Sequence, residues 1–220
     1  MTVSHEQMQQ AMRDRALTLS VVTTGATSLS ATATGYARAA GSFLTDGFRI
    51  GMEVAGTSFS FAANTAAKVI TDVSALALTC PGCVVEAAGT RTLTVGLPEK
   101  RDWENLPLTP VAGRPYVREQ YLPGPMAKVT LGPGGELESD PLYVLQIFVP
   151  ANTGFLALAK YADALLDHFA PDTALSLANG DVLTVRTKPA PWRGQLLQDV
   201  PGWAVVPVTI PFRLRTPTAN

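Results

Sequence analysis

The amino-acid sequence predicts an α+β protein that combines a mostly antiparallel sheet and flanking helices with a small all-β module. Residues 126–214 carry the pattern strand, strand, helix, strand, strand, which is typical of a sheet with a helix on one face. Residues 18–97 are rich in Thr, Ser, Ala, Gly and Val and show short alternating runs between turn residues, as in a sandwich or small barrel. These two segments differ in composition and in their pattern of predicted elements, which indicates two structural parts within one chain.

A helix is expected near the start of the chain, from Ser4 to Leu17. Ser4 and Gln7 have the spacing of a capping box, in which two side chains bind free backbone N–H groups of the first turn. Apolar residues recur at approximately helical intervals and form one stripe, namely Met8, Ala11, Met12, Ala16 and Leu19. The stripe indicates an amphipathic helix.

Four strands are expected in the all-β module, because alternating runs rich in β-forming residues lie there between turn residues. The runs are Met52–Phe59, Ala66–Val73, Leu76–Cys80 and Arg91–Val95.

The motif Cys80-Pro81-Gly82-Cys83 is the one segment with catalytic associations. A redox dithiol of this type has its first thiolate at a helix N-terminus, but here no helical pattern follows the motif. A metal site would need further ligands, and the chain offers only His5 and His168 at no recognised spacing. We interpret the motif as a structural turn with two free or locally paired cysteines, and a redox or metal function is the alternative. No metal or cofactor is expected.

The second half contains the clearest pattern in the sequence. Strand Met126–Leu131 is followed by a Gly-rich loop and by the alternating strand Leu142–Val149, after which an amphipathic helix is expected. Asn152 or Thr153 is the expected N-cap, and Pro171 bars the helix from continuing beyond Ala170. Its apolar stripe, which we expect in the core, consists of Phe155, Leu158, Ala159, Ala162, Leu165, Leu166 and Phe169.

Two further strands are expected, Asp181–Lys188 and Trp203–Leu214. In the last strand the even-numbered residues from Ala204 to Leu214 are apolar, as a half-buried strand requires. Pro207 and Pro211 have the opposite parity, so both missing N–H donors lie on the same lateral side. This pattern predicts an edge strand, or a strand whose outer side meets another subunit through side chains.

The composition argues against a protein that binds polyanions and leaves open whether part of the surface is covered by other proteins. Charged residues make up only 16% of the chain, below the roughly 25% usual for soluble domains, so part of the surface is either rich in small residues or covered by partners. Seventeen basic and eighteen acidic residues leave a net charge of −1. No apolar run approaches the ~20 residues that span a bilayer, and the N-terminal segment is polar, so we expect no membrane partner and production in the cytoplasm.

No catalytic residue is predicted. His5 and His168 both lie in expected helices, and neither is flanked by a nucleophile pattern. The segment Gly132-Pro133-Gly134-Gly135 lacks the lysine and the helix of a phosphate-binding loop, and the acidic residues after it would repel phosphate. We interpret it as a mobile hairpin connection, which is also what a partner-gripping arm looks like.

A series of residues between Pro98 and Pro125 resembles a known protein family. The series begins with Trp103-Glu104-Asn105, continues with Pro110, Gly113, Arg114, Pro115, Tyr116 and Val117, and ends with Leu122-Pro123. Together with the strand-to-helix unit at Phe148–Phe169 and two closing strands, it resembles the tail terminator proteins of long-tailed (siphovirus-type) bacteriophages. The resemblance covers Ser4–Leu17 and Pro98–Leu214, and it rests on the order of elements more than on any single residue.

The resemblance implies a division of the chain into a core and an insertion. Residues 1–17 and 98–220 would form the tail-terminator-like core. Residues 18–97, where the family usually has only a short connection, would form an inserted small β domain. Inserted domains favour exposed positions, so we expect this one on the outside of the assembly.

The resemblance also implies a structural protein of the virion and not an enzyme. We expect a hexameric ring, assembled in the host cytoplasm, that caps the tail tube, ends tail polymerisation and joins the tail to head-completion (neck) proteins. Nucleic acid would meet the ring only by passing through its lumen. Contacts are expected in the loops Gly132–Asp140 and Pro189–Gln198, where Trp192 and Arg193 are residue types enriched at interface hot spots. The candidate interaction residues are Gly132, Gly134, Gly135, Glu136, Glu138, Asp140, Trp192, Arg193 and Gln195.

Other functions stay open from the sequence. Another phage neck or connector protein, or a tail-tube subunit, would share these features, although a tube subunit would form long tubes by itself. The β module could instead bind carbohydrate on the host surface. Carbohydrate binding of this kind requires exposed aromatic residues on a flat face, and the module contains only Tyr36 and a few phenylalanines.

Overall fold

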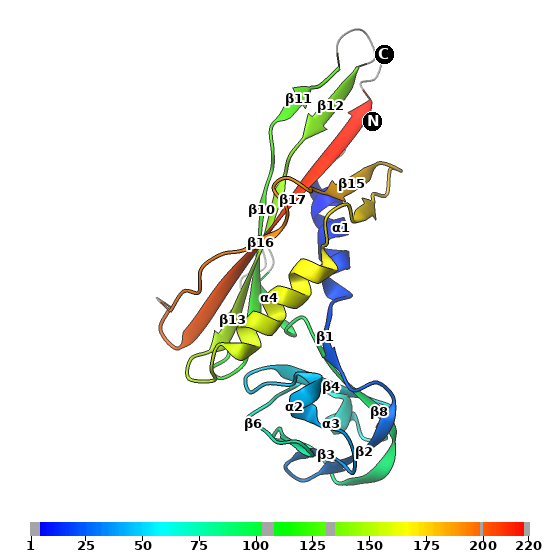
Figure 1. The fold of residues 1–220 in the computed structure, drawn as a ribbon, viewed down its shortest axis with the longest axis vertical. Coiled ribbons are helices and arrows are strands. Elements are labelled where there is room, and N and C mark those ends of the chain that lie inside the picture. The colour runs from blue at the N-terminus through cyan, green and yellow to red at the C-terminus, as the bar shows by residue number, and fades with distance from the viewer. Residues whose placement is uncertain (1–4, 103–107, 131–134, 199, 218–220) are drawn as a thin grey trace.

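The structure, a computed structural model, describes residues 5–102, 108–130, 135–198 and 200–217. Two sheets, two long helices and two short helices make up this part of the chain, and a small barrel-like unit lies at one end of an elongated sheet (Figure 1). Among the described residues, all strand pairs except β9 with β10 are antiparallel, which confirms the predicted α+β class. Within the described residues no helix is long and apolar enough to cross a membrane.

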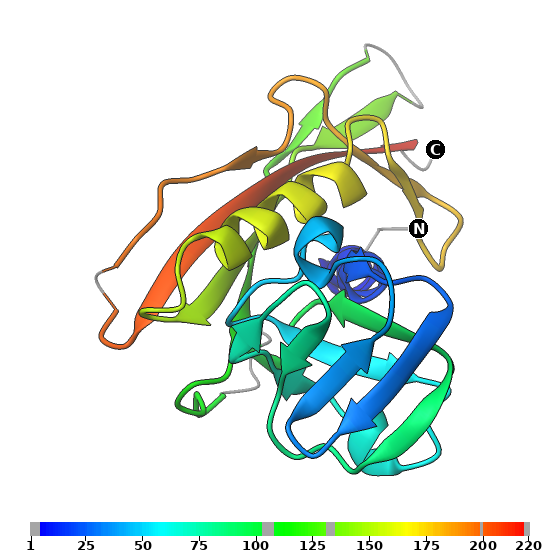
Figure 2. The same ribbon diagram turned by 60° about the horizontal axis from the view of Figure 1, so that its bottom comes forward.

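The first sheet takes its eight strands from residues 20–96 and runs in the order β5-β4-β8-β2-β3-β7-β6, with β1 also paired to β8. Only two residues of chain separate its end strands β5 and β6, so the sheet curls round on itself (Figure 2). These two linking residues continue the pairing of the strands beside them: Ile70 N donates to Met52 O, next to β4, at 2.8 Å, and Thr71 N donates to Thr79 O of β7 at 2.8 Å. The strands are β1 Ser20–Thr23, β2 Thr27–Thr32, β3 Gly35–Arg38, β4 Glu53–Thr57, β5 Lys68–Val69, β6 Asp72–Val73, β7 Ala77–Thr79 and β8 Glu86–Gly96.

The curled sheet encloses an apolar core because alternate residues of its strands point inward. Two short helices, α2 (Phe43–Asp46) and α3 (Ala62–Thr65), close it. The largest side chains that are fully buried inside are Leu29, Tyr36, Phe43, Phe48, Met52, Ile70 and Leu78.

The second sheet holds nine strands in the order β11-β12-β17-β13-β10-β9, and the short strands β15 and β16 also pair with β17. Helices α1 (His5–Leu17) and α4 (Leu156–His168) lie on the same face of this sheet (Figure 1). Its strands are β9 Lys100–Asp102, β10 Tyr116–Leu122, β11 Met126–Lys128, β12 Glu136–Ser139, β13 Leu142–Pro150, β14 Ala174–Ser176, β15 Val182–Val185, β16 Trp192–Arg193 and β17 Trp203–Pro217.

The helix after β13 starts later than the sequence predicts. Neither Asn152 nor Thr153 caps it: Phe155 is the N-cap residue and has no capping side chain. Asn152 has a φ of +71° and Gly154 a φ of +85°, because the chain uses these residues to turn back from the strand. Thr153 Oγ1 instead donates to Pro150 O at 2.7 Å.

Strand β17 is central in the second sheet, so the predicted edge strand is wrong. β13 pairs along one side of it, and β16, β15 and β12 follow one another along the other side. The carbonyl oxygens of Pro207 and Pro211 on that second side accept hydrogen bonds from Gly194 N at 2.7 Å and Arg186 N at 2.9 Å. Proline removes only the donor of a residue, so short strands can pair around each gap.

The two sheets are joined through the carboxylate of Glu53 on β4. Arg114, which precedes β10, places its Nη2 2.6 Å from Glu53 Oε1, and Glu99 N donates to Glu53 Oε2 at 2.7 Å. Glu53 N also donates to the hydroxyl of Tyr161 on α4 at 3.4 Å. Buried apolar residues of both sheets belong to one continuous cluster, so the barrel-like unit packs firmly against the second sheet and its helices.

Candidate interaction surfaces

One candidate surface is a hairpin that extends beyond the main body of the second sheet. Strand β11 pairs with β12, which in turn pairs with the last residues of β17, and Figure 1 shows this part projecting at the top. Every residue of β11 is exposed, and so are the apolar side chains of Met126 and Val129. β11 ends the order of strands in the described sheet, so one row of its backbone groups faces outward. We call Met126–Val129 the hairpin edge.

A second candidate surface lies at the other end of the same sheet, where β13 ends and β17 begins. Phe155 and Leu156, at the start of α4, are 51% and 65% exposed. Large apolar side chains this exposed are unusual when they gather in one place. The segment before β17 adds three more exposed apolar residues, and together we call these five residues the end patch: Phe155, Leu156, Leu196, Leu197 and Val200.

Two shallow grooves meet at Phe155, and each is lined in part by residues of the end patch. One groove lies between α4 and the segment after β16, and its lining includes Leu158, Leu196 and Val206. The other lies between the turn after β13 and the segment before β17, and its lining includes Gly154, Val200 and Trp203. The patch therefore contains partly apolar grooves into which a side chain of another protein can fit.

The residues of the Pro189–Gln198 loop that were predicted to make contacts lie on both faces of the second sheet. Arg193 pairs with Val208 on the helix-covered face and lies 3.6 Å from Asp163 of α4. Gln195 lines the groove beside Phe155. Trp192 pairs with Thr209, so its half-exposed ring lies on the opposite face. The structure thus brings Arg193 and Gln195 to the end patch, but not Trp192.

The segment Gly132–Asp140 was predicted to be a loop, but part of it is a strand, which corrects its predicted conformation; its role in contacts stays a prediction. Glu136–Ser139 is β12, because its backbone pairs with β11 and β17 on its two sides. Glu138 lies 2.7 Å from Arg215 of β17, and Asp140 lies 2.5 Å from Arg186, so both acids pair with arginines of this chain.

The glycines of this segment are only partly described. Gly132 and Gly134 lie outside the described residues. Gly135 is described, and a Cβ at that position would lie 2.7 Å from Thr130 O. Glycine is therefore required there for the hairpin to close. Glu136 is exposed on β12, close to the hairpin edge.

Phe155 and Leu156 are the functional candidates that the sequence pattern missed. Phe155 was expected on the core stripe of the helix, but it precedes the first helical turn and faces solvent. A signal was present, since two adjacent large apolar residues at a helix start cannot both lie on one narrow stripe. Trp103-Glu104-Asn105 lies outside the described residues.

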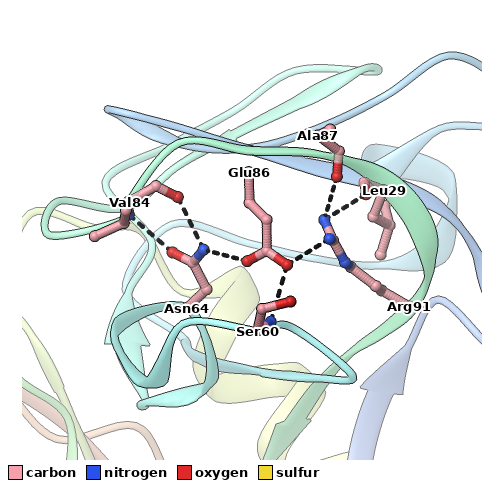
Figure 3. Close-up of polar contacts among 7 residues, drawn as sticks. All are labelled: Leu29, Ser60, Asn64, Val84, Glu86, Ala87 and Arg91. Atoms are coloured by element: carbon pink, nitrogen blue, oxygen red, sulfur yellow. Dashed lines mark hydrogen bonds and ion pairs between the residues drawn. The ribbon is translucent and has the colours of Figure 1, made fainter.

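A polar clamp within the barrel-like unit holds its exposed turns in place (Figure 3). Glu86 accepts hydrogen bonds from Ser60 N at 2.8 Å and Asn64 Nδ2 at 3.0 Å, and it lies 2.5 Å from Arg91 Nη2. Asn64 also binds both the N–H and the carbonyl of Val84 at 2.8 Å. The clamp fixes the turn before β8 against α3.

The clamp predicts a specific acid sensitivity. The N–H of Ser60, and then Asn64 and Arg91, lower the pKa of Glu86 to about 2. Because the folded pKa is depressed, this stabilisation is complete above the unfolded value of ~4.3 and is lost as pH falls toward 2. Glu86→Gln should therefore reduce the drop in melting temperature between pH 5 and pH 2. A melting curve at each pH tests this, and Glu136→Gln, which removes an exposed carboxyl, should leave the drop unchanged.

The fold and these surfaces define a protein built for contacts with other proteins, with apolar side chains gathered at one end and an outward strand edge at the other. Among the described residues no group of three or more His, Cys, Asp or Glu side chains is placed to hold a metal. The chain belongs to the phage tail terminator protein family, whose model matches residues 84–212, more than half of its length. No curated protein and no solved structure matches the chain.

The family match gives a structural role in the bacteriophage tail, as a component of the virion that interacts with other tail or neck proteins. The matched residues run from just before β8 to the middle of β17. They include the end patch and the hairpin edge, so both candidate surfaces lie in the part of the chain that the family shares.

Proposed function

We propose that the protein forms a hexameric ring that caps the tail tube, ends tail polymerisation and joins the tail to head-completion proteins. The observation that carries this proposal is the position of the end patch and the hairpin edge at opposite ends of one strand. β17 starts beside the end patch and ends beside the hairpin, and its fifteen residues put the two surfaces about 45 Å apart.

Two different surfaces at opposite ends of a chain suit head-to-tail contacts between copies. Such contacts close into a ring when the rotation between neighbours is a whole fraction of a turn, and otherwise they continue as a filament. A ring explains why apolar side chains stay exposed in the single chain, since a neighbour would bury them. The tail-tube protein and the head-completion protein would then bind the two faces of the ring, and DNA would pass through its lumen.

We also propose that residues 18–97 form a domain inserted into this ring subunit. The support is that the first sheet takes all its strands from residues 20–96, while every strand of the second sheet follows it in the chain. In the ring this domain would lie on the outside, held in one orientation by Glu53.

The test is assembly of the full chain with and without a change in the end patch. We expect the purified protein to give six-membered rings in particle images and a matching mass in solution, and to halt tail-tube growth. Leu156→Asp should prevent ring formation because it would place a charge in an apolar contact, which costs several kcal/mol when it is buried unpaired. The matched control is Val85→Asp on the barrel-like unit, where the side chain is equally exposed at 68%.

The control should assemble like the unchanged protein. A chain that stays monomeric at high concentration, even beside tail tubes, contradicts the ring. If Leu156→Asp forms normal rings, the proposed contact at the end patch is contradicted, but the proposal of a ring is not.

A further inference from the structure

Cys80 and Cys83 form a pair of free thiols in the turn between β7 and β8. Cys83 Sγ lies 3.5 Å from the carbonyl oxygen of Cys80, so the turn brings the second side chain back over the first residue. Cys80 is fully buried, whereas Cys83 is partly exposed. One thiol of the pair is therefore within reach of a small molecule, and the other is shielded.

The turn that carries the thiols is held on both sides. Cys80 N donates to Thr34 O at 2.8 Å, and Val84, next to Cys83, is bound through both its N–H and its carbonyl by Asn64. Gly82 has a φ of +88°, which permits the tight reversal between the cysteines. Since the backbone is already fixed, joining the two sulfur atoms costs little further loss of conformational freedom.

The surroundings divide the two thiols into a nucleophile and a partner. A hydrogen bond from Cys80, with help from Tyr36 and the positive charge of Lys68, lowers the pKa of Cys83 to about 6. The hydrogen bond to Cys83, burial and the charge of Cys83 raise the pKa of Cys80. Lys68 is held beside the turn by the carbonyl oxygens of Ala63 and Ala66. The hydrogen bond from Cys80, with the charge of Lys68 added, thus does what the absent helix N-terminus would do in a redox dithiol.

We propose that Cys80 and Cys83 are a thiol–disulfide exchange site that reacts with low-molecular-weight disulfides, such as glutathione disulfide, and closes an internal Cys80–Cys83 bond. In the first step the Cys83 thiolate attacks one sulfur of the small disulfide. A Cys83–glutathione mixed disulfide forms, and one glutathione thiolate leaves. In the second step Cys80 sulfur attacks Cys83 Sγ, the bond to glutathione breaks, and the departing sulfur takes the Cys80 proton.

The first step prepares the second. Once Cys83 is part of a mixed disulfide it carries no negative charge, so two of the three causes that raise the pKa of Cys80 disappear. The attraction of Lys68 for a Cys80 thiolate remains. Cys80 therefore becomes the attacking group only when the small disulfide has already been captured.

The exchange makes physical sense for a component of a virus particle. Thiols stay reduced in the cytoplasm, where the chain is made, and are oxidised outside the cell. The new bond would link the end of β7 to the residue next to Val84, and so add a covalent tie to the turn that the polar clamp already holds (Figure 3).

The test uses mass spectrometry of the full-length protein after exposure to glutathione disulfide. The unchanged chain should lose two hydrogens and retain no glutathione, and reductant should reverse this. Cys80→Ser should retain one glutathione per chain, because the resolving thiol is gone, whereas Cys83→Ser should stay unmodified because its remaining thiol is buried. In the unchanged chain, the rate of alkylation by iodoacetamide should be half-maximal near pH 6, against about pH 8.5 for an ordinary thiol.

Three results would overturn the proposal. The unchanged chain stays fully reduced, it keeps a bound glutathione, or Cys83→Ser reacts as fast as Cys80→Ser. If a serine variant fails to fold, peptide mapping of the oxidised unchanged chain decides, since a disulfide-linked peptide that contains both cysteines is required.

Discussion

Replacing Glu119 by alanine should lower the free energy of unfolding by about 3–5 kcal/mol, the cost of removing one partner from a buried ion pair. Glu119 lies on β10, and its carboxylate is completely buried beneath α1. Arg13 of α1 donates to both carboxylate oxygens, with Nε at 2.8 Å and 2.7 Å. Gln9 of the same helix and the hydroxyl of Tyr143 on β13 donate to it as well, the latter at 2.9 Å.

The change should act mainly by leaving donors without an acceptor. Tyr143 is buried, and an unsatisfied buried hydroxyl costs about 1–3 kcal/mol. Arg13 keeps some access to water and can recover part of its hydration. Because this carboxylate is the main polar link between α1 and the sheet in the described structure, we also expect the helix to fray or detach.

Urea unfolding followed by circular dichroism measures the loss, and hydrogen exchange along α1 shows whether the helix detaches. The matched control is Glu138→Ala, which removes the partner of the exposed Arg215 and should cost less than about 1 kcal/mol. Equal losses from the two variants would show that the Glu119 cluster does not hold the helix.

Features that depend on near neighbours in the chain were predictable from the sequence. The stripe of Met8, Met12 and Ala16 gave the first helix, and the alternation of Tyr143, Leu145 and Ile147 gave β13, because periodicity reports which face an element buries. The short strands β1, β2, β3 and β14 were not predicted. They carry only a few alternating residues each. Pairing with β8 makes β1 and β2 strands, pairing with β2 and β7 makes β3 a strand, and pairing with β15 makes β14 a strand.

The features that the sequence predicted wrongly or missed depend on contacts between residues that are distant in the chain. Pro207 and Pro211 do lack donors, but the sequence could not show that Gly194 and Arg186 would reach their carbonyl oxygens. The same holds for the candidate surfaces. The composition of the Pro189–Gln198 loop pointed to Trp192, Arg193 and Gln195, while the end patch exists only because β13 ends and β17 begins at the same end of the sheet.

Replacing Glu53 by alanine should loosen the joint between the two sheets. We expect a loss of about 2 kcal/mol, in the range of one hydrogen bond to a charged group in a buried site. The carboxylate is almost fully buried, and its removal leaves Glu99 N and part of the Arg114 guanidinium without their acceptor. Arg114 is partly exposed and keeps its contact with Glu99 at 2.7 Å, so the loss should be smaller than for Glu119.

The effect should be visible as a change in how the parts move as well as in stability. Hydrogen exchange at Glu99 N should speed up, and proteases should cut sooner at residues 97–102 and 108–115, because these residues lie between the barrel-like unit and β10 in the chain. Glu99→Ala is the matched control, since it removes only the exposed acid from the same arginine and should cost less than about 1 kcal/mol. If Glu99→Ala loosens the segment as much as Glu53→Ala, the joint is held by surface charge and not by the buried carboxylate, and the orientation proposed for the inserted domain loses its support.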